Sequence, residues 1–163
     1  LRRLAAAQDL RVIPLAAGMR LAGEPDVAIE VLHPPPGLLP GVAAGSNDNS
    51  LVVKVTKGSV SFLLTGDIEE DGLPRLLEAG DALRATVLKV PHHGSRLGEA
   101  GRRFFQRVAP KIALLSVGRL HRLPAPQTLD ALRQTGAAVY STREQGRLRV
   151  RTDGSCVEIE TFR

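Results

Sequence analysis

The C-terminal half of the chain alternates between two kinds of apolar segment, and this alternation restricts the fold more than any other feature. Strand patterns are predicted at 85–90, 112–117 and 137–141, with helix patterns between them at 98–108 and 126–135. The segment from Ile112 to Val117 is almost continuously apolar, which is typical of a strand buried on both faces. Strands that alternate with helices indicate a sheet covered by helices.

Two β-hairpins frame the alternating region. Each is a pair of β-rich segments: 51–56 with 59–64, and 147–151 with 156–161. The first pair is joined by Lys57-Gly58, and the second turns at Asp153-Gly154, where we expect a type I′ turn. Hairpins combined with strand–helix repeats predict an α/β (α+β) fold with a mixed β-sheet flanked by helices.

The remaining segments are shorter and more polar. We expect a helix over 1–9, strands over 10–14 and 27–32, a long loop over 37–48 and a helix over 69–79. His33 comes directly before three prolines, which cannot continue a strand ladder. We therefore interpret His33 as a structural residue at a strand end. Pro74 is expected to shorten or kink its helix.

Length and cysteine content limit the class of protein. The chain has 163 residues, 43% of them hydrophobic, which suffices for one compact core. Cys156 is the single cysteine, so an internal disulfide and a multi-cysteine metal site are excluded. No membrane-spanning or signal-peptide run is present, and we expect a soluble piece. Because the sequence starts at Leu1 without an initiator Met, we expect residues 1–163 to be a single domain, or part of one, from a longer protein.

Positive charge is concentrated in the second half of the chain. Residues 1–84 hold 8 Lys/Arg against 11 Asp/Glu, whereas residues 85–163 hold 14 against 6. Seven basic residues lie between positions 96 and 122, and Glu99 is the single acid among them. Such a field attracts a polyanion, nucleic acid first among the candidates. The alternative is a solvated face in an arginine-rich protein.

Polar side chains follow two of the apolar segments, where each strand is expected to end. Thr65-Gly66-Asp67 follows Val60–Leu64, and Pro91-His92-His93-Gly94-Ser95 follows Ala85–Val90. Polar residues at the carboxyl ends of neighbouring strands converge in one crevice of an open α/β sheet. Asp67 is therefore a candidate metal ligand or base, and the alternative is an N-cap of the helix expected at 69.

The adjacent histidines His92 and His93 are candidate metal ligands. Neutral imidazoles are the preferred nitrogen ligands of zinc, manganese and iron, and Gly94 permits close approach. Since neighbouring side chains in a strand point to opposite faces, we expect one histidine to face a metal and the other to anchor a loop or contact substrate. The alternative is two loop histidines without a ligand. Ser95 is a candidate cap of the next helix, and no acid is spaced to complete a serine triad.

Two other polar segments could reach the same crevice. Asn47-Asp48-Asn49-Ser50 precedes the first hairpin and has the composition of a turn. His121 lies beyond the buried strand at 112–117, and the expected topology can bring it to the strand ends.

Four motifs in a fixed order resemble one family. They are Asn-Asp-Asn-Ser-Leu-Val-Val-Lys at 47–54, Phe-Leu-Leu-Thr-Gly-Asp at 62–67, Leu-Lys-Val-Pro-His-His-Gly-Ser at 88–95 and Ala-Leu-Leu-Ser-Val-Gly at 113–118. Together they resemble the metallo-β-lactamase-like domain at the C-terminal end of the ComEC competence proteins, which are membrane channels of DNA uptake. The resemblance runs over residues 10–152.

The resemblance implies a metallo-β-lactamase-like αββα sandwich, of which this chain holds mainly the C-terminal half, and hydrolysis of a phosphodiester in DNA. The cofactor it implies is divalent zinc or manganese, one or two ions, which would activate water and clamp the phosphoryl oxygens. The implied metal ligands are Asp67, His92 and His121. The implied catalytic residues, which hold the phosphate or orient the ligands, are His93, Ser95 and Asn47. The implied contacts to nucleic acid are Arg96, Arg119 and Arg122.

The resemblance also implies partners and a location. The partners are DNA, single-stranded in particular, and the membrane channel portion of the same protein. The location is the outer, periplasmic or extracytoplasmic, face of a bacterial cell membrane.

Two departures from the family pattern leave a second hypothesis open. The His-x-His-x-Asp-His ligand motif is absent from the sequence, and Leu123-Pro124-Ala125-Pro126 stands where relatives carry Gly-His-Pro. We expect the first motif upstream of residue 1, with His121 as a substitute for the second. The chain is then part of a metal-dependent nuclease. The alternatives are a non-catalytic, basic nucleic-acid-binding module and hydrolysis of a small phosphoester or lactone on the same fold.

Overall fold

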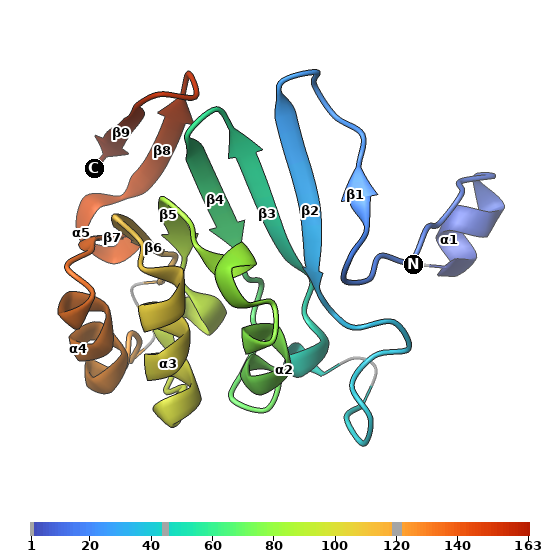
Figure 1. The fold of residues 1–163 in the computed structure, drawn as a ribbon, viewed down its shortest axis with the longest axis horizontal. Coiled ribbons are helices and arrows are strands. Elements are labelled where there is room, and N and C mark those ends of the chain that lie inside the picture. Colours follow the sequence, from blue (N-terminus) through green and yellow to red (C-terminus); the bar gives the residue numbers. More distant parts are fainter. Residues whose placement is uncertain (1, 44–45, 119–121) are drawn as a thin grey trace.

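The computed structural model describes residues 2–43, 46–118 and 122–163, and within them an α/β protein (Figure 1). The strands are β1 Arg20–Leu21, β2 Val27–His33, β3 Val52–Lys57, β4 Val60–Leu64, β5 Val87–Lys89, β6 Ile112–Leu115, β7 Ala138–Ser141, β8 Arg147–Thr152 and β9 Val157–Phe162. The α-helices are α1 Arg2–Ala7, α2 Leu73–Leu77, α3 Gly98–Val108, α4 Pro126–Gln134 and α5 Thr142–Gln145. Short 3-10 helices are η1 Asn47–Asn49, η2 Gly80–Leu83 and η3 Pro91–Gly94.

The main sheet is mixed and has seven strands in the order β1-β2-β3-β4-β5-β6-β7. Pairing is antiparallel from β1 to β4 and parallel from β4 to β7. The parallel part is the region of strand–helix alternation, because each crossover needs a connection long enough to return to the same edge. A mixed sheet flanked by helices is confirmed.

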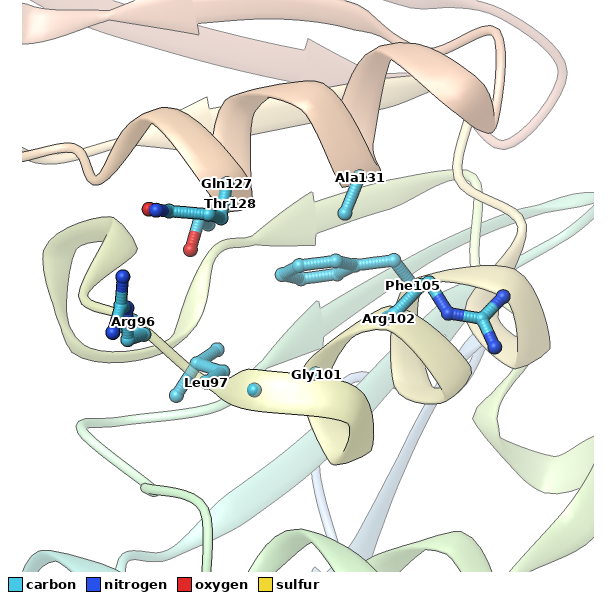
Figure 2. A pocket seen from close by; sticks show the side chains of 9 residues that line it. Arg96, Leu97, Gly101, Arg102, Phe105, Gln127, Thr128 and Ala131 are labelled. Carbon is cyan, nitrogen blue, oxygen red and sulfur yellow. The ribbon is translucent and has the colours of Figure 1, made fainter.

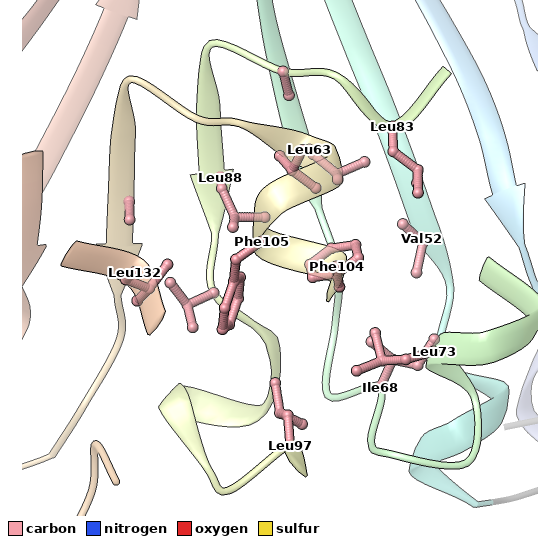
Figure 3. Packing of buried hydrophobic residues seen from close by; sticks show 14 of the residues in the cluster. Val52, Leu63, Ile68, Leu73, Leu83, Leu88, Leu97, Phe104, Phe105 and Leu132 are labelled. Atoms are coloured by element: carbon pink, nitrogen blue, oxygen red, sulfur yellow. The ribbon is translucent and has the colours of Figure 1, made fainter. Parts of the chain in front are cut away.

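The core lies between this sheet and the helices α2, α3 and α4, which pack on one of its faces (Figure 1). The apolar residues of α3 recur at helical spacing, at positions 101, 104, 105 and 108, and all four are buried. Figure 3 shows Phe104 and Phe105 of this helix lying over Leu63 and Leu88 of the strands. Each fully buried side chain of this size stabilises the fold by roughly 1.5–3 kcal/mol relative to exposure. The expected boundaries of α3 are confirmed.

The prediction of an N-terminal strand over 10–14 is wrong. Leu10, Val12 and Ile13 are more than half exposed, and the edge of β2 pairs instead with β1. A strand requires a partner as well as β-prone residues, and the edge available here is taken by Arg20–Leu21.

The helix expected over 69–79 begins four residues late, at Leu73, and ends at Leu77. Pro74 lies in its first turn, where the missing N–H of proline costs nothing. The expected shortening at Pro74 is confirmed, and the preceding residues form a loop that belongs to the site described below.

The closing hairpin is present, but the prediction of a type I′ turn is wrong. Thr152 pairs with Val157, so the connection has four residues rather than two. The carboxylate of Asp153 accepts hydrogen bonds from the backbone N–H groups of Ser155, at 2.8 Å, and Cys156, at 3.0 Å. These side-chain bonds close the turn in place of a two-residue backbone turn.

This hairpin, β8–β9, forms a second, two-stranded sheet whose tip rests on the β3–β4 turn. The N–H of Ser59 donates to the carbonyl of Gly154 at 2.7 Å. Gly58 has φ +54°, and a Cβ there would come within 2.4 Å of that same carbonyl oxygen. Glycine is therefore required at this turn for both conformation and contact.

No helix among the described residues is both long and apolar enough to cross a lipid bilayer.

Candidate active site at the strand ends

The carboxyl ends of β4 and β5 lie side by side, as expected from the sequence. The two strands are parallel neighbours, with Leu64 opposite Lys89. The ammonium group of Lys89 donates to the carbonyl of Gly66 at 2.6 Å, and the N–H of His92 lies 3.4 Å from the same oxygen. The two polar segments that leave these strands therefore form one site.

Asp67 points its carboxylate toward two other side chains of this site. Its Oδ1 lies 3.3 Å from Nζ of Lys89 and 3.8 Å from Nε2 of His93. The side chain is 42% exposed, so it is open to a ligand from solvent. The alternative of an N-cap is wrong because α2 begins six residues later and Asp67 donates its own backbone N–H to Ser50 Oγ.

The capping role belongs instead to Asp48, which is distant in sequence. Its Oδ1 accepts hydrogen bonds from the backbone N–H groups of Glu69, at 3.2 Å, and Gly72, at 2.7 Å. Asp48 is buried, with 6% of its surface exposed. The carboxylate thus satisfies donors ahead of α2 that no local residue satisfies.

One ring nitrogen of His93 is fixed by a backbone carbonyl, and the other makes no hydrogen bond to a described residue. Its Nδ1 lies 2.6 Å from the carbonyl oxygen of Ser116, which can only accept a hydrogen bond. In the neutral ring, Nδ1 therefore carries the proton and Nε2 carries the lone pair. The lone pair is on the nitrogen nearest Asp67. A cavity of about 180 Å³ adjoins the ring and is lined by His93, Ser116, Val117, Gly118 and Leu123.

His92 lies against the carboxylate of Glu69, a residue that the sequence led us to expect only in a helix. Its Nδ1 lies 2.7 Å from Oε1 of Glu69, although poorly aligned for a hydrogen bond. Asn47 donates from Nδ2 to the same Oε1 at 2.8 Å. Asn47 therefore reaches the site through Glu69. Since both histidines have Nδ1 facing an acceptor, their Nε2 atoms are the ones left for a ligand.

The two histidines lie in a left-handed turn and not in a strand. Their φ angles are 41° for His92 and 56° for His93, and Gly94 follows with φ 84°. The expected opposite orientation of the two rings was based on strand alternation, which does not apply to this backbone. The ring centroids are 6.1 Å apart. A left-handed residue with a Cβ costs roughly 1–2 kcal/mol, and such strain concentrates at functional sites.

Tight packing holds this turn in place. A Cβ on Gly94 would come within 2.7 Å of Cβ of Pro124 and 2.8 Å of Cδ2 of Leu115. Ser95 follows with its Oγ buried and without a hydrogen-bond partner among the described residues. Ser95 does not cap α3, whose N-cap residue is Leu97.

The segment Asn47–Ser50 is more than the turn expected from its composition. Besides Asn47 and Asp48, Asn49 accepts the N–H of Leu39 at 2.9 Å, and Ser50 Oγ accepts the N–H of Asp67 at 3.2 Å. Each side chain of the segment thus forms hydrogen bonds with a different residue or pair of residues. Four consecutive hydrogen-bonding residues before a hairpin were the signal that could have identified this role.

His33 packs beneath this segment, in agreement with its structural interpretation. It is 1% exposed, and its Nδ1 lies 3.0 Å from the carbonyl oxygen of Ser50. Burial lowers the pKa of His33, more than the contact with that carbonyl raises it. The ring is therefore neutral at neutral pH and acts as a polar support.

The basic candidates are dispersed. Arg96 is exposed beside a cavity between α3 and α4 (Figure 2), and Arg122 is exposed after the third strand end. Arg119 and His121 lie outside the described residues. Within 2–43, 46–118 and 122–163, no three His, Cys, Asp or Glu side chains form a group arranged to hold a metal ion.

Comparison with known proteins finds relatives but no matching family model. The chain is similar to ComE operon protein 3 of Bacillus subtilis (strain 168), at 36% identity over 110 residues, 66% of this chain and 14% of that protein. It is similar to the uncharacterized protein YcaI of Escherichia coli (strain K12), at 36% over 126 residues, 73% of this chain and 17% of that protein. It is also similar to competence protein ComA of Neisseria gonorrhoeae, at 30% over 105 residues, 63% of this chain and 15% of that protein. The chain thus spans about a sixth of the length of these relatives.

Proposed function

We propose that this chain is part of a metal-dependent phosphodiesterase that cuts DNA strands during uptake by a competence protein. The observation that carries the proposal is the approach of Asp67 Oδ1 to Nε2 of His93, at 3.8 Å. The similarity to a protein named for competence supports the DNA-uptake context.

The donor atoms suit a divalent cation such as zinc or manganese. Asp67 offers a carboxylate oxygen, and His93 offers Nε2 while its Nδ1 is held by a backbone carbonyl, the usual outer support of a metal-binding imidazole. A cation bound there would polarise a phosphoryl oxygen and make a water molecule more acidic. Two donors do not complete a coordination shell, so we expect His92 Nε2, His121 and residues upstream of the chain to supply others.

The remaining residues of the site orient Asp67 and His93 and supply positive charge for a phosphate. Ser116 holds the tautomer of His93, and Ser50 holds the backbone of Asp67 through its N–H. Lys89 holds the Gly66 carbonyl and places a positive charge 3.3 Å from the Asp67 carboxylate, where it can also neutralise a phosphate oxygen. Arg96 and Arg122, with Arg119, would draw the phosphate backbone toward the strand ends.

An apolar sheet face opposite the helices supports the proposal of a lactamase-like αββα sandwich. Strand alternation puts Val55, Phe62 and Leu64 on the face opposite Leu63, which packs on the helices. Leu64 is 45% exposed, and Val55 and Phe62 are half-buried. An apolar sheet face is stable when a further layer covers it. We propose that upstream polypeptide forms that layer and brings further ligands.

The test is hydrolysis of single-stranded DNA by the protein extended through its upstream sequence, with manganese or zinc added. We expect Asp67→Ala to abolish cleavage without changing the thermal unfolding midpoint by more than a few degrees. Asp71→Ala is the matched control, because Asp71 is an exposed acid close in sequence. Full cleavage by Asp67→Ala would refute the proposal.

A second candidate is a non-catalytic, basic nucleic-acid-binding module. The observation that favours it is Lys89, whose ammonium group already supplies a cation to Asp67. In that case the extended protein would bind DNA in a salt-dependent manner and contain no stoichiometric metal by elemental analysis.

The location and partner follow from the same proposal. We propose that the domain is joined to the membrane channel portion of the same protein and lies on the outer face of the cell membrane. Protease accessibility in intact spheroplasts distinguishes the two faces.

A further inference from the structure

The exposed side of α3 is an arginine surface. Arg102, Arg103 and Arg107 are exposed on this helix, while Gly101, Phe104, Phe105 and Val108 face the core. Arg84 follows η2 next to the helix, and Arg96 precedes it. We call Arg84, Arg96, Arg102, Arg103 and Arg107 the α3 arginine face. None of these residues belongs to the strand-end site described above except Arg96.

Two hollows of different character flank α3. The α3–α4 cavity has a volume of about 310 Å³ and an apolar floor that includes Leu97, Phe105 and Ala131. Figure 2 shows Arg96 near one end of this cavity, Gln127 and Thr128 on its α4 side, and Arg102 beyond Phe105. The volume is at the lower limit of small-molecule sites, about 300–1,000 Å³. It therefore suits one flat, base-sized group.

The second hollow, the α2–α3 groove, is polar. It has a volume of about 330 Å³ and is lined by Leu77, Arg84, Arg103, Gln106 and Arg107. Three guanidinium groups around one hollow suit phosphate oxygens, which they bind through paired hydrogen bonds.

The acids near these arginines leave the surface with excess positive charge. Glu99 pairs with Arg102, and this contact lowers the pKa of Glu99. Asp81 is shared between Arg107, at 3.3 Å, and Arg84, at 3.8 Å. Among the described residues, neither Arg96 nor Arg103 forms an ion pair within 4 Å, although the charge of Arg103 also helps to lower the pKa of Glu99. Two exposed acids, Asp81 and Glu99, thus pair with this face of five arginines, and a phosphate can replace them at little cost because exposed pairs are weak. Glu70 is a third exposed acid, at the start of α3.

We infer that this surface binds a single-stranded nucleic acid, with one unpaired base in the α3–α4 cavity and its neighbouring phosphates on the α3 arginine face and in the α2–α3 groove. In a single strand, flat apolar bases alternate with anionic phosphates. On this surface, an apolar cavity likewise lies between guanidinium groups. A paired base is stacked in its duplex and cannot enter the cavity. An anionic lipid surface fits less well, because the exposed residues of α3 include no large apolar side chain to insert.

The surface is continuous with the strand-end site. Gly98, the first residue of α3, lies against the carboxylate of Glu70, in the loop that follows Asp67. The eleven residues of α3 extend about 16 Å from there. The inference rests on the proposed DNA substrate but not on metal chemistry, and it assigns the arginine face as the path by which a strand reaches the site.

The experiment measures binding of the full chain to fluorescent oligonucleotides by anisotropy, in EDTA so that hydrolysis plays no part. The probes are ten-residue oligothymidine, the same backbone without bases, and a duplex. We expect Ala131→Met, which fills the cavity without changing charge, to weaken oligothymidine binding about fivefold or more and leave the abasic probe unchanged, since one stacked base contributes at least that factor.

The charge component is tested separately. Arg103→Gln combined with Arg107→Gln should weaken binding of both single-stranded probes and reduce the slope of log K against log salt by about 1.4, at about 0.7 per lost phosphate contact. Arg133→Gln removes an exposed arginine two residues beyond Ala131, on the far side of α4, and should change neither probe's affinity.

Three results would overturn the inference: equal loss for the oligothymidine and abasic probes in Ala131→Met, tighter binding of the duplex than of oligothymidine, or binding only to phosphatidylserine vesicles. If Ala131→Met does not fold, Ala131→Leu takes its place, and the arginine variants test the surface independently. Base-dependent binding in a protein that never cleaves DNA would leave this inference intact and refute the nuclease alone.

Discussion

Asp48 is the residue whose loss should most affect the architecture of the candidate site. Replacing it with alanine removes the acceptor of two backbone N–H groups, from Glu69 at 3.2 Å and Gly72 at 2.7 Å. Gly72 is buried, so its N–H would remain without a partner, which costs about 1–3 kcal/mol. Glu69 is less buried, and water can restore part of its bond. We expect a total loss of about 2–4 kcal/mol in free energy of unfolding.

The assay is urea denaturation of the full chain, monitored by far-UV circular dichroism. With a slope near 2 kcal/mol/M, the midpoint of Asp48→Ala should fall by about 1–2 M. Asp48→Asn keeps Oδ1 as an acceptor and should lose less than half as much. A matched control is Asp71→Ala, which removes an exposed acid from the loop whose N–H groups Asp48 accepts.

Equal losses in Asp48→Asn and Asp48→Ala would refute the hydrogen-bond argument, because the two variants differ in that acceptor. A loss below about 0.5 kcal/mol in Asp48→Ala would refute it as well, since surface substitutions have effects of that size.

Three further predictions concern stability. His33 is buried with its pKa lowered, so the unfolded chain binds more protons at acid pH than the folded chain does. The contribution of His33 to the free energy of unfolding should be fully present above about pH 6.5 and decrease as the pH falls from there toward the folded pKa. His33→Gln should flatten this dependence in denaturant titrations. Gly94→Ala should lower the thermal midpoint by several degrees through left-handed strain and contact with Pro124 and Leu115, as measured by calorimetry. Hydrogen bonds from Cys156 and Ser155 lower the pKa of Asp153, so Asp153→Ala should increase amide exchange in β8–β9 whereas Asp153→Asn should not.

Controls accompany each of these. Gly136 has a φ of 79°, close to that of Gly94, but no atom lies within 4 Å of an added Cβ. Gly136→Ala therefore measures the cost of backbone strain without the cost of a steric clash. An unchanged pH profile in His33→Gln would show that another group titrates. Equal exchange in the two Asp153 variants would mean that the carbonyl oxygen of the side chain does not close the turn.

Local patterns in the sequence were enough to predict most of the architecture. Helix α3 was expected at 98–108 because its apolar residues recur at helical spacing and Pro110 follows, and the hairpin of β3 and β4 was expected from a single glycine turn. The convergence of Asp67 and the histidines was expected because parallel strands end at one edge of a sheet. These properties depend on residues close in sequence, or on the topology that such elements allow.

Tertiary structure decided which partner each polar group takes. Asp48 caps donors that lie 21 and 24 residues away, and Glu69 links Asn47 to His92 across a distance of 45 residues. The left-handed turn at His92 and His93 continues into Gly94, against which Leu115 and Pro124 pack so closely that no side chain fits there. A hydrogen bond or a strained turn depends on what other segments place beside it, and composition and periodicity carry no information about those neighbours.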